Sequence, residues 1–117
     1  MLHLDATENV PRNQAVVAGS NVTLQCRSNS NGISQWKHKQ ATGAEETTLT
    51  YGQNISGHGD RLTLNTTIDG QYDLHITNAD RVHAGIYICI TEEKPASGNG
   101  LLKTQRFEAQ LVILCEC

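Results

Sequence analysis

Short runs in which apolar and polar residues alternate recur along almost the whole chain. In residues 83–90 the alternation places Tyr87 and Cys89 on one face of a strand and three isoleucines on the other. Residues 22–26 have the same period and end at Cys26. Further alternating runs cover residues 33–39, 47–51, 61–66, 72–76 and 103–114. About nine short strands at this spacing, with no helical period, predict an all-β fold of two packed sheets.

Two stretches fit this pattern poorly. Residues 1–18 form a broken first strand, because Pro11 removes a backbone donor and is tolerated only at an edge or at a switch between sheets. Residues 52–60 contain three glycines and predict an irregular connection with only a weak strand signal. Asp69-Gly70 predicts a hairpin turn before the run that ends at residue 76.

Four residues of these runs form a recognisable combination. Trp36 follows Cys26 by ten residues, and Tyr87 precedes Cys89 by two. The chain thereby resembles the immunoglobulin superfamily, of V-type or the closely related I-type, over almost its whole length. The resemblance implies a two-sheet antiparallel sandwich of about nine strands. It also implies a Cys26–Cys89 disulfide between the sheets, Trp36 packed on its sulfurs, and a Tyr87 hydroxyl bonded to the backbone near residues 79–81.

The chain departs from the family pattern at two places. Members usually carry an aspartate at the position of His83, paired with an arginine that corresponds here to Arg61. Asp80 is an alternative partner for Arg61, but its different place in the corner predicts a poor geometric match, so the sequence leaves this ion pair in doubt. On the last strand, Phe107 is followed by Glu-Ala-Gln and not by the Gly-x-Gly bulge of antigen-receptor domains. That strand should therefore run regular, which argues against antibody-like chain pairing.

Length and cysteine content set the organisation. With 117 residues the chain corresponds to one domain, residues 1–114, and residues 115–117 predict the start of a stalk or C-terminal tail. Cys115 and Cys117 have only each other as further cysteines, and a Cys-x-Cys ring is strained. Links to a second chain or a following stalk are therefore favoured over an unpaired or truncated end.

The same cysteines and three Asn-x-Ser/Thr sites, at Asn21, Asn54 and Asn65, favour an extracellular domain that carries glycans. The first five residues lack the features of a signal peptide, which suggests a mature domain behind an added initiator methionine. The chain has no apolar run of membrane-spanning length, so we expect membrane attachment only through a segment outside it. A net charge of −3 makes nucleic acid an improbable partner.

No catalytic or cofactor-binding pattern emerges from the sequence. The five histidines are scattered without metal-ligand spacing, and no nucleophile, phosphate-binding or zinc motif is present. Paired acidic residues such as Glu45-Glu46 are expected to be solvated. We therefore expect neither enzymatic activity nor a cofactor.

The outward side of the larger sheet is the candidate binding surface. Its predicted residues are Gln35, Lys37 and Lys39, then Ile86, Ile88 and Ile90, then Arg106, Glu108 and Gln110. Three isoleucines on the solvent side of a central strand are unfavourable unless something covers them. Either a protein partner covers them, or the aliphatic stems of Lys37, Lys39 and Arg106 do so within the monomer.

The leading interpretation is a cell-surface or secreted recognition module, adhesive or immune-receptor-like. It would bind a protein partner through this face, as a homodimer or as a heterodimer of the same geometry. One alternative is binding of a small or carbohydrate ligand by the loops at residues 27–32, 52–60 and 91–101, which hold few aromatic residues. The other is a structural spacer joined through its terminal cysteines. The sequence leaves open the identity of the ligand and the choice between homophilic and heterophilic binding.

Overall fold

The computed structural model of the chain describes residues 10–28, 33–43, 45–56, 61–66, 70–93 and 103–114. Within them lie nine strands and one short 3-10 turn, η2. The strands are β1 Gln14–Val17, β2 Val22–Leu24, β3 Ile33–Gln40, β4 Glu46–Tyr51, β5 Asn54–Ile55, β6 Leu62–Asn65, β7 Asp73–Ile76, β8 Gly85–Glu93 and β9 Lys103–Leu114, and η2 spans Arg81–His83. The all-β prediction is confirmed, as is the predicted extent of β9.

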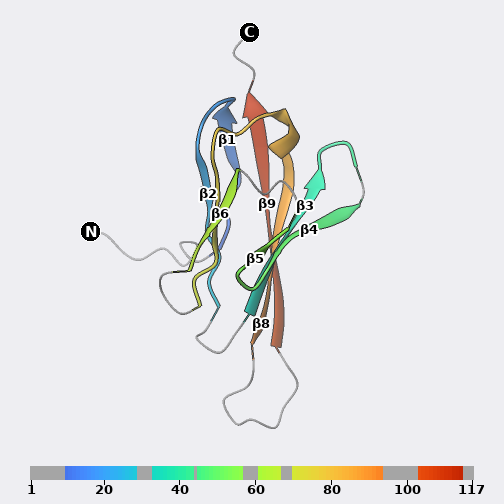
Figure 1. Cartoon of the computed structure of the whole chain (residues 1–117). Helices are drawn as coiled ribbons and strands as arrows, with labels where there is room; N and C mark the ends of the chain where they lie inside the picture. The colour runs from blue at the N-terminus through green and yellow to red at the C-terminus, as the bar shows by residue number, and fades with distance from the viewer. Residues whose placement is uncertain are drawn as a thin grey trace, which may run out of the picture.

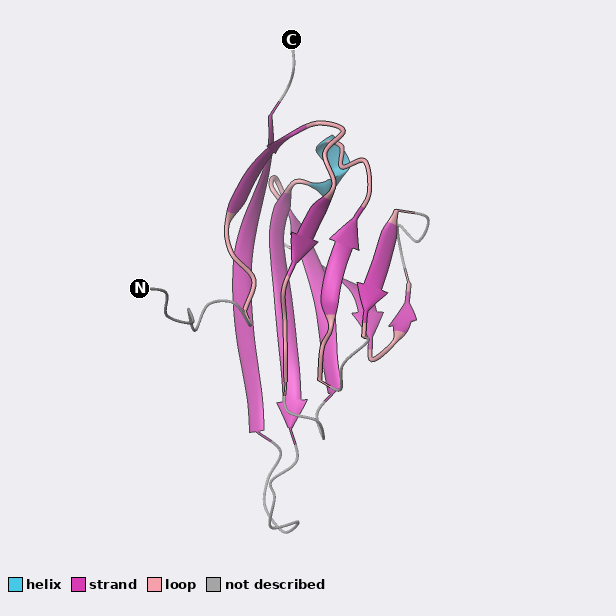
Figure 2. Cartoon of the chain, turned by 90° about the vertical axis from the view of Figure 1, so that its left-hand side faces the viewer, coloured by secondary structure: helices cyan, strands magenta, loops and turns pink. Residues whose placement is uncertain are grey.

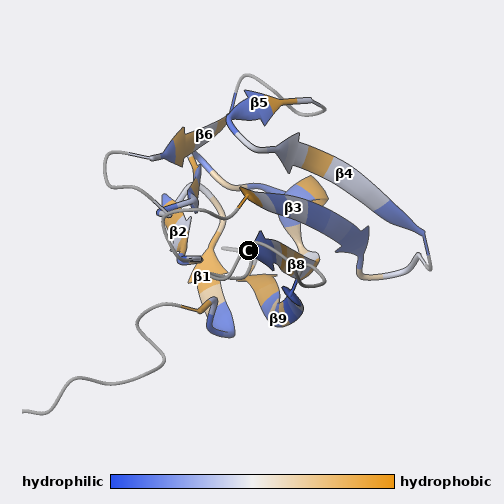
Figure 3. Cartoon of the chain, turned by 90° about the horizontal axis from the view of Figure 1, so that it is seen from below, coloured by the Kyte–Doolittle hydropathy of each residue, from blue (hydrophilic) through white to orange (hydrophobic). Residues whose placement is uncertain are grey.

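The strands form two sheets that pack face to face (Figures 1 and 2). One sheet has six strands in the order β1-β9-β8-β3-β4-β5, and the other has three in the order β2-β7-β6. All neighbouring strands pair antiparallel except β1 and β9, which run parallel. The view from below in Figure 3 separates the side of β2 and β6 from the side of β4, β3, β8 and β9. This is the predicted immunoglobulin-like sandwich.

Alternation along each strand supplies the core between the sheets. In β3 the inward residues Ser34, Trp36 and His38 are buried, and their outward neighbours are partly accessible. The largest fully buried side chains come from both sheets: Trp36, Tyr87, Leu24, Leu49, Leu74, Ile76, Ile88 and Leu111. All but Ile88 belong to the core cluster between the sheets.

A disulfide joins Cys26 and Cys89 across this core, as the family resemblance implies. Both cysteines and Trp36 are fully buried in the same cluster. The Trp36 indole donates a hydrogen bond to the carbonyl of Tyr72 at 2.7 Å, which satisfies its single polar group. The Asp73 carboxylate accepts from the backbone N–H of Cys26 at 3.1 Å, tying β7 to the residues that follow β2.

Near Pro11 the sequence predicts an edge position or a switch of the first strand between the two sheets, and the structure agrees with this prediction. Pro11 is buried, and three residues later β1 begins as an edge strand of the six-stranded sheet. The Gln14 side chain donates to the carbonyl of Thr23 at 2.9 Å, so one link back to β2 remains. Residues 1–9, which hold the earlier part of the expected first strand, lie outside the described residues.

The turn before β8 is built around Asp80 and His83. The two residues form a capping box, in which each side chain accepts a hydrogen bond from the backbone N–H of the other. The Asp80 carboxylate accepts from His83, and His83 Nδ1 accepts from Asp80 at 3.0 Å. The Tyr87 hydroxyl donates to the carbonyl of His83 at 2.5 Å, and not to residues 79–81 as expected. Burial raises the pKa of this hydroxyl.

Arg61 has an acidic partner after all. Its guanidinium lies 3.4 Å from the Asp80 carboxylate and also donates to the carbonyl of Asn78 at 3.1 Å. The expectation that Asp80 is badly placed was therefore wrong. His83 is buried, and its Nδ1 accepts a hydrogen bond from the N–H of Asp80, so the residue at the position of the usual aspartate has a structural role in the turn.

Gly85 opens β8 at a point where no side chain fits. Its φ is +134°, and an added Cβ would lie 2.3 Å from the carbonyl oxygen of Lys39. The same Cβ would approach His38 Nε2 to 3.0 Å. That imidazole is buried, stacks on the Tyr87 ring at 4.5 Å and hydrogen-bonds the carbonyl of Ala84 at 2.9 Å. The glycine thus lets β3 and β8 approach closely enough to bury His38.

Candidate protein-binding face

The outer face is the side of the six-stranded sheet that points away from β2, β7 and β6. Strand register places all nine residues predicted for the binding surface on it, in three rows across β3, β8 and β9. The rows are Gln35–Ile90–Arg106, Lys37–Ile88–Glu108 and Lys39–Ile86–Gln110. β3 is coloured hydrophilic over most of its length in Figure 3, consistent with the lysines of this face.

An ion pair crosses this face diagonally. Arg106 Nη2 lies 2.5 Å from the Oε2 atom of Glu46, and Arg106 Nε lies 3.0 Å from Glu108. Glu46 stands on β4 opposite Lys39, so the pair links the first row at β9 with the third row at β4. Three strand spacings, about 14 Å, separate those strands. Two long side chains are needed to span that distance, and they come from the rows on either side of the Ile88 row.

Ile88 lies in the middle row and is 0% exposed. Ile86 and Ile90, in the rows above and below, are partly exposed. The prediction that all three isoleucines are exposed to solvent was therefore wrong for Ile88, the middle one. Because Arg106 and Glu46 meet across the Ile88 row, the structure supports covering within the monomer at this position.

The ion pair is held at the surface and changes the titration of both partners. Its hydrogen bond from Arg106 lowers the pKa of the Glu46 carboxyl below its ordinary value. The bonds to Glu46 and Glu108 in turn raise the pKa of the Arg106 guanidinium. The sequence predicts that Glu46 is only solvated. In the structure it is the register partner of Lys39, so its side chain lies on the outer face.

Part of the exposed apolar surface of this face forms a group that we call the Tyr51 patch: Ile33, Gln35, Tyr51 and Ile90. On β9, Val112 and Leu114 are 38% and 46% exposed on the same face. Tyr51 is 50% exposed and Ile33 is 43% exposed. Register places Tyr51 opposite Gln35, and Gln35 opposite Ile90. Sequence reasoning missed Ile33 and Tyr51. Alternation along β3 already puts Ile33 on the side of Gln35, whereas a register shift between Trp36 and Lys37 hides the position of Tyr51.

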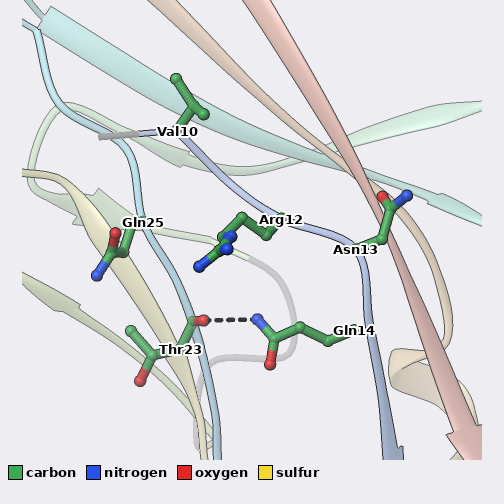
Figure 4. Close-up of a pocket in the computed structure, with 6 residues that line it drawn as sticks. All are labelled: Val10, Arg12, Asn13, Gln14, Thr23 and Gln25. Carbon is green, nitrogen blue, oxygen red and sulfur yellow. Dashed lines mark hydrogen bonds between the residues drawn. The ribbon is translucent and has the colours of Figure 1, made fainter. Parts of the chain in front are cut away.

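A separate hollow lies at the junction of β1 and β2 (Figure 4). This groove has a volume of about 400 Å³ and is lined by Val10, Arg12, Asn13, Gln14, Thr23 and Gln25. Gln14 bridges it through its bond to Thr23. These six described residues present mostly amide and hydroxyl groups, together with the guanidinium of Arg12.

Other predicted sites fall elsewhere or beyond the described residues. Asn21 and Asn65 belong to the three-stranded sheet and its approach, while Asn54 lies on β5. Cys115 and Cys117 lie outside the described residues, as does most of the three loops considered for ligand binding. Among the residues described, no group of three or more His, Cys, Asp or Glu side chains is placed to hold a metal. That part of the chain also contains no helix long and apolar enough to cross a membrane.

Solved structures with the same architecture include the homodimer of RIG-5 IG1, with a TM-score of 0.70 and 14% identity over 90% of this chain and 92% of that one. The Ig1 domain of mouse SynCAM 2 gives a TM-score of 0.66 and 19% identity over 92% of this chain and 96% of that one. Dpr1 IG1, solved bound to DIP-eta IG1, gives 0.67 and 15% over 91% of both chains. At these identities the likeness establishes the fold.

A search of curated protein sequences finds no significant match to this chain. The profile of the immunoglobulin V-set domain matches residues 9–106, most of the chain. This interval includes the Cys26–Cys89 disulfide, the buried Trp36 and every strand except β9, of which it covers only residues 103–106. The chain therefore belongs to the immunoglobulin V-set family.

Proposed function

We propose that this domain is an extracellular, non-enzymatic recognition module that binds another protein through the outer face, with a second copy of the chain as the simplest partner. The observation that carries the proposal is the Tyr51 patch. An exposed aromatic ring and an exposed isoleucine lie on neighbouring strands of one sheet face, at a cost in solvation that a partner would remove. Tyrosine is also among the residues enriched at protein interfaces.

Charge on the same face supports a self-complementary contact. Lys37 and Glu108 flank Ile88 on opposite sides within one row. A two-fold axis running along β8 would set the lysine side of one copy against the glutamate side of the other. Such opposed charges favour the correct alignment of the two copies and increase the association rate.

Family membership and the structural neighbours support the same class of function. V-set domains are typically recognition modules of extracellular proteins. Of the neighbours, RIG-5 IG1 was solved as a homodimer, and Dpr1 IG1 was solved bound to another IG1 domain. Pairing between immunoglobulin domains of this shape therefore occurs, and both homophilic and heterophilic forms are represented.

The test compares variants of equal chemistry on and off the face. Tyr51→Arg and Ile33→Arg introduce charge into the Tyr51 patch, and Val82→Arg is the matched control on η2, where Val82 is 52% exposed. Sedimentation equilibrium of the proteins refolded without glycan, over a wide concentration range, should show a dimer for wild type and Val82→Arg, and a monomer for the two patch variants. Wild type that stays monomeric at the highest concentration would overturn the homophilic form. Patch variants that dimerise like wild type would overturn the assignment to this face.

A further inference from the structure

Asn54 is anchored directly beside Tyr51 on the outer face. The two residues are register partners across the β4–β5 hairpin. Opposite residues of an antiparallel pair point to the same side, with Cβ atoms roughly 5 Å apart. The turn between them has only two residues, and Gly52 occupies its first position at a φ of 58°, where glycine is favoured. The short turn fixes the position of Asn54 relative to the tyrosine.

Asn54 is also the acceptor of an Asn-x-Ser glycosylation site, Asn54-Ile55-Ser56, and its side chain is exposed. The other two acceptors lie on the opposite layer of the sandwich. Asn65 ends β6 opposite Asp73, and Asn21 precedes β2 and accepts a hydrogen bond from the N–H of Asn78 at 3.0 Å. Of the three sites, Asn54 alone shares a face with the Tyr51 patch.

We infer that N-glycosylation of Asn54 is a steric gate on the outer face: the glycan covers the Tyr51 patch, and only chains without it pair through that face. This inference rests on the function proposed above. A branched, hydrated oligosaccharide attached next to the ring occupies the volume that a partner needs. Pressing a partner against it would remove water from sugar hydroxyls without supplying matched hydrogen bonds, which is unfavourable. The glycans expected at Asn21 and Asn65 have no such effect, because they attach to the other sheet.

The decisive comparison uses two substitutions at Ser56 that leave Asn54 in place. Ser56→Ala destroys the glycosylation site, and Ser56→Thr preserves it. Among the described residues, the Ser56 hydroxyl contacts the carbonyls of Thr48 and Leu49, both at a long 3.4 Å, so either change is structurally mild. Proteins secreted from a glycosylating host are analysed by mass spectrometry for occupancy at Asn54 and by sedimentation for self-association.

We expect Ser56→Ala to strengthen self-association by about tenfold or more relative to wild type, and Ser56→Thr to behave like wild type. Thr67→Ala, which removes the site at Asn65, should leave association unchanged. Equal association of wild type and Ser56→Ala, with Asn54 occupied in wild type, would overturn the inference. An Asn54 that carries no sugar in the secreted wild type would overturn it as well.

Chain refolded without any glycan separates failure of this inference from failure of the proposed function. If the glycan-free protein dimerises and the protein glycosylated at Asn54 dimerises equally, the gate is wrong and the binding face stands. If the glycan-free protein with its Cys26–Cys89 disulfide intact remains monomeric, the homophilic face and its gate both fail.

Discussion

Arg106 and Glu46 are 60 residues apart in the chain, yet their side chains meet with Nη2 and Oε2 2.5 Å apart. They stand on β9 and β4, so their contact spans the two strands between them. Ile88, in the row that they cross, is fully buried although it points away from the main core. The outer face therefore has a covered part around Ile88 and an open part at the Tyr51 patch.

The Arg106–Glu46 ion pair should contribute little to the free energy of unfolding. Arg106→Gln and Glu46→Gln, singly and together, are expected to change the unfolding midpoint little, because both groups are exposed and screened. A double-mutant cycle measured by thermal unfolding should show coupling at low salt that disappears at high salt. Absence of coupling at low salt would contradict the pairing.

The same pair predicts a pH dependence with a definite sign. The pKa of Glu46 is lowered in the folded protein, so its stabilising contribution is complete above the unfolded-state pKa. The contribution is lost as pH falls through the lowered, folded-state pKa. The loss of stability over that acidic window, followed by urea unfolding, should be smaller in Arg106→Gln than in wild type. An equal loss would show that Glu46 is not linked to Arg106.

Ile88 should behave as a core residue despite lying on the outer face. Ile88→Ala is expected to lower the free energy of unfolding by about 2–4 kcal/mol, because it leaves a cavity at a fully buried position. Ile33→Ala, on the same face but 43% exposed, should cost no more than about 0.5 kcal/mol. Urea denaturation monitored by Trp36 fluorescence measures both. Similar costs at the two positions would contradict the difference in burial.

Gly85 should tolerate no side chain. Gly85→Ala forces a Cβ against the Lys39 carbonyl at a φ of +134°, and we expect a loss of at least about 2 kcal/mol. Gly43→Ala is the matched control, since its added Cβ would meet nothing closer than 3.8 Å. Its effect should be within about 0.5 kcal/mol of zero. Chemical unfolding of the two variants makes the comparison, and a stable Gly85→Ala would refute the close approach of β3 and β8.

Asp80 combines two roles that can be separated. Asp80→Ala removes both the cap on η2 and the partner of Arg61, and should cost about 1 kcal/mol. Asp80→Asn keeps an acceptor for the cap and loses only the exposed ion pair, so its cost should be much smaller. Thermal unfolding at equal pH distinguishes them. If Asn were as damaging as Ala, the ion pair would be the dominant contribution of Asp80.

Strand periodicity alone was sufficient to predict the sandwich and most of its inward residues. Trp36, Leu74 and Leu111 are buried where alternation places them, and β9 has the predicted bounds. Each of those predictions depends only on neighbours along one strand. The position of β5 was less predictable, because a strand of two residues in a glycine-rich segment carries almost no periodic signal.

The covering of Ile88 could not be predicted in the same way. It depends on which residues of β4 and β9 face each other across two other strands, and on a register shift between Trp36 and Lys37. Periodicity gives the side to which a residue points but not its neighbours on that side. The Tyr87 hydroxyl bond to His83 was missed for a related reason, since it depends on the exact path of the η2 turn.

The parallel pairing of β1 and β9 also determines how the domain would respond to mechanical force. Gln14 to Val17 run alongside Leu111 to Leu114 in the same direction. Tension that pulls β1 backward from its start and β9 forward from its end slides the two strands past each other. The hydrogen bonds between them then carry the load together and do not open one after another. The β1–β9 pair would therefore resist shear under such tension. After these strands separate, the Cys26–Cys89 disulfide would limit further extension of the chain.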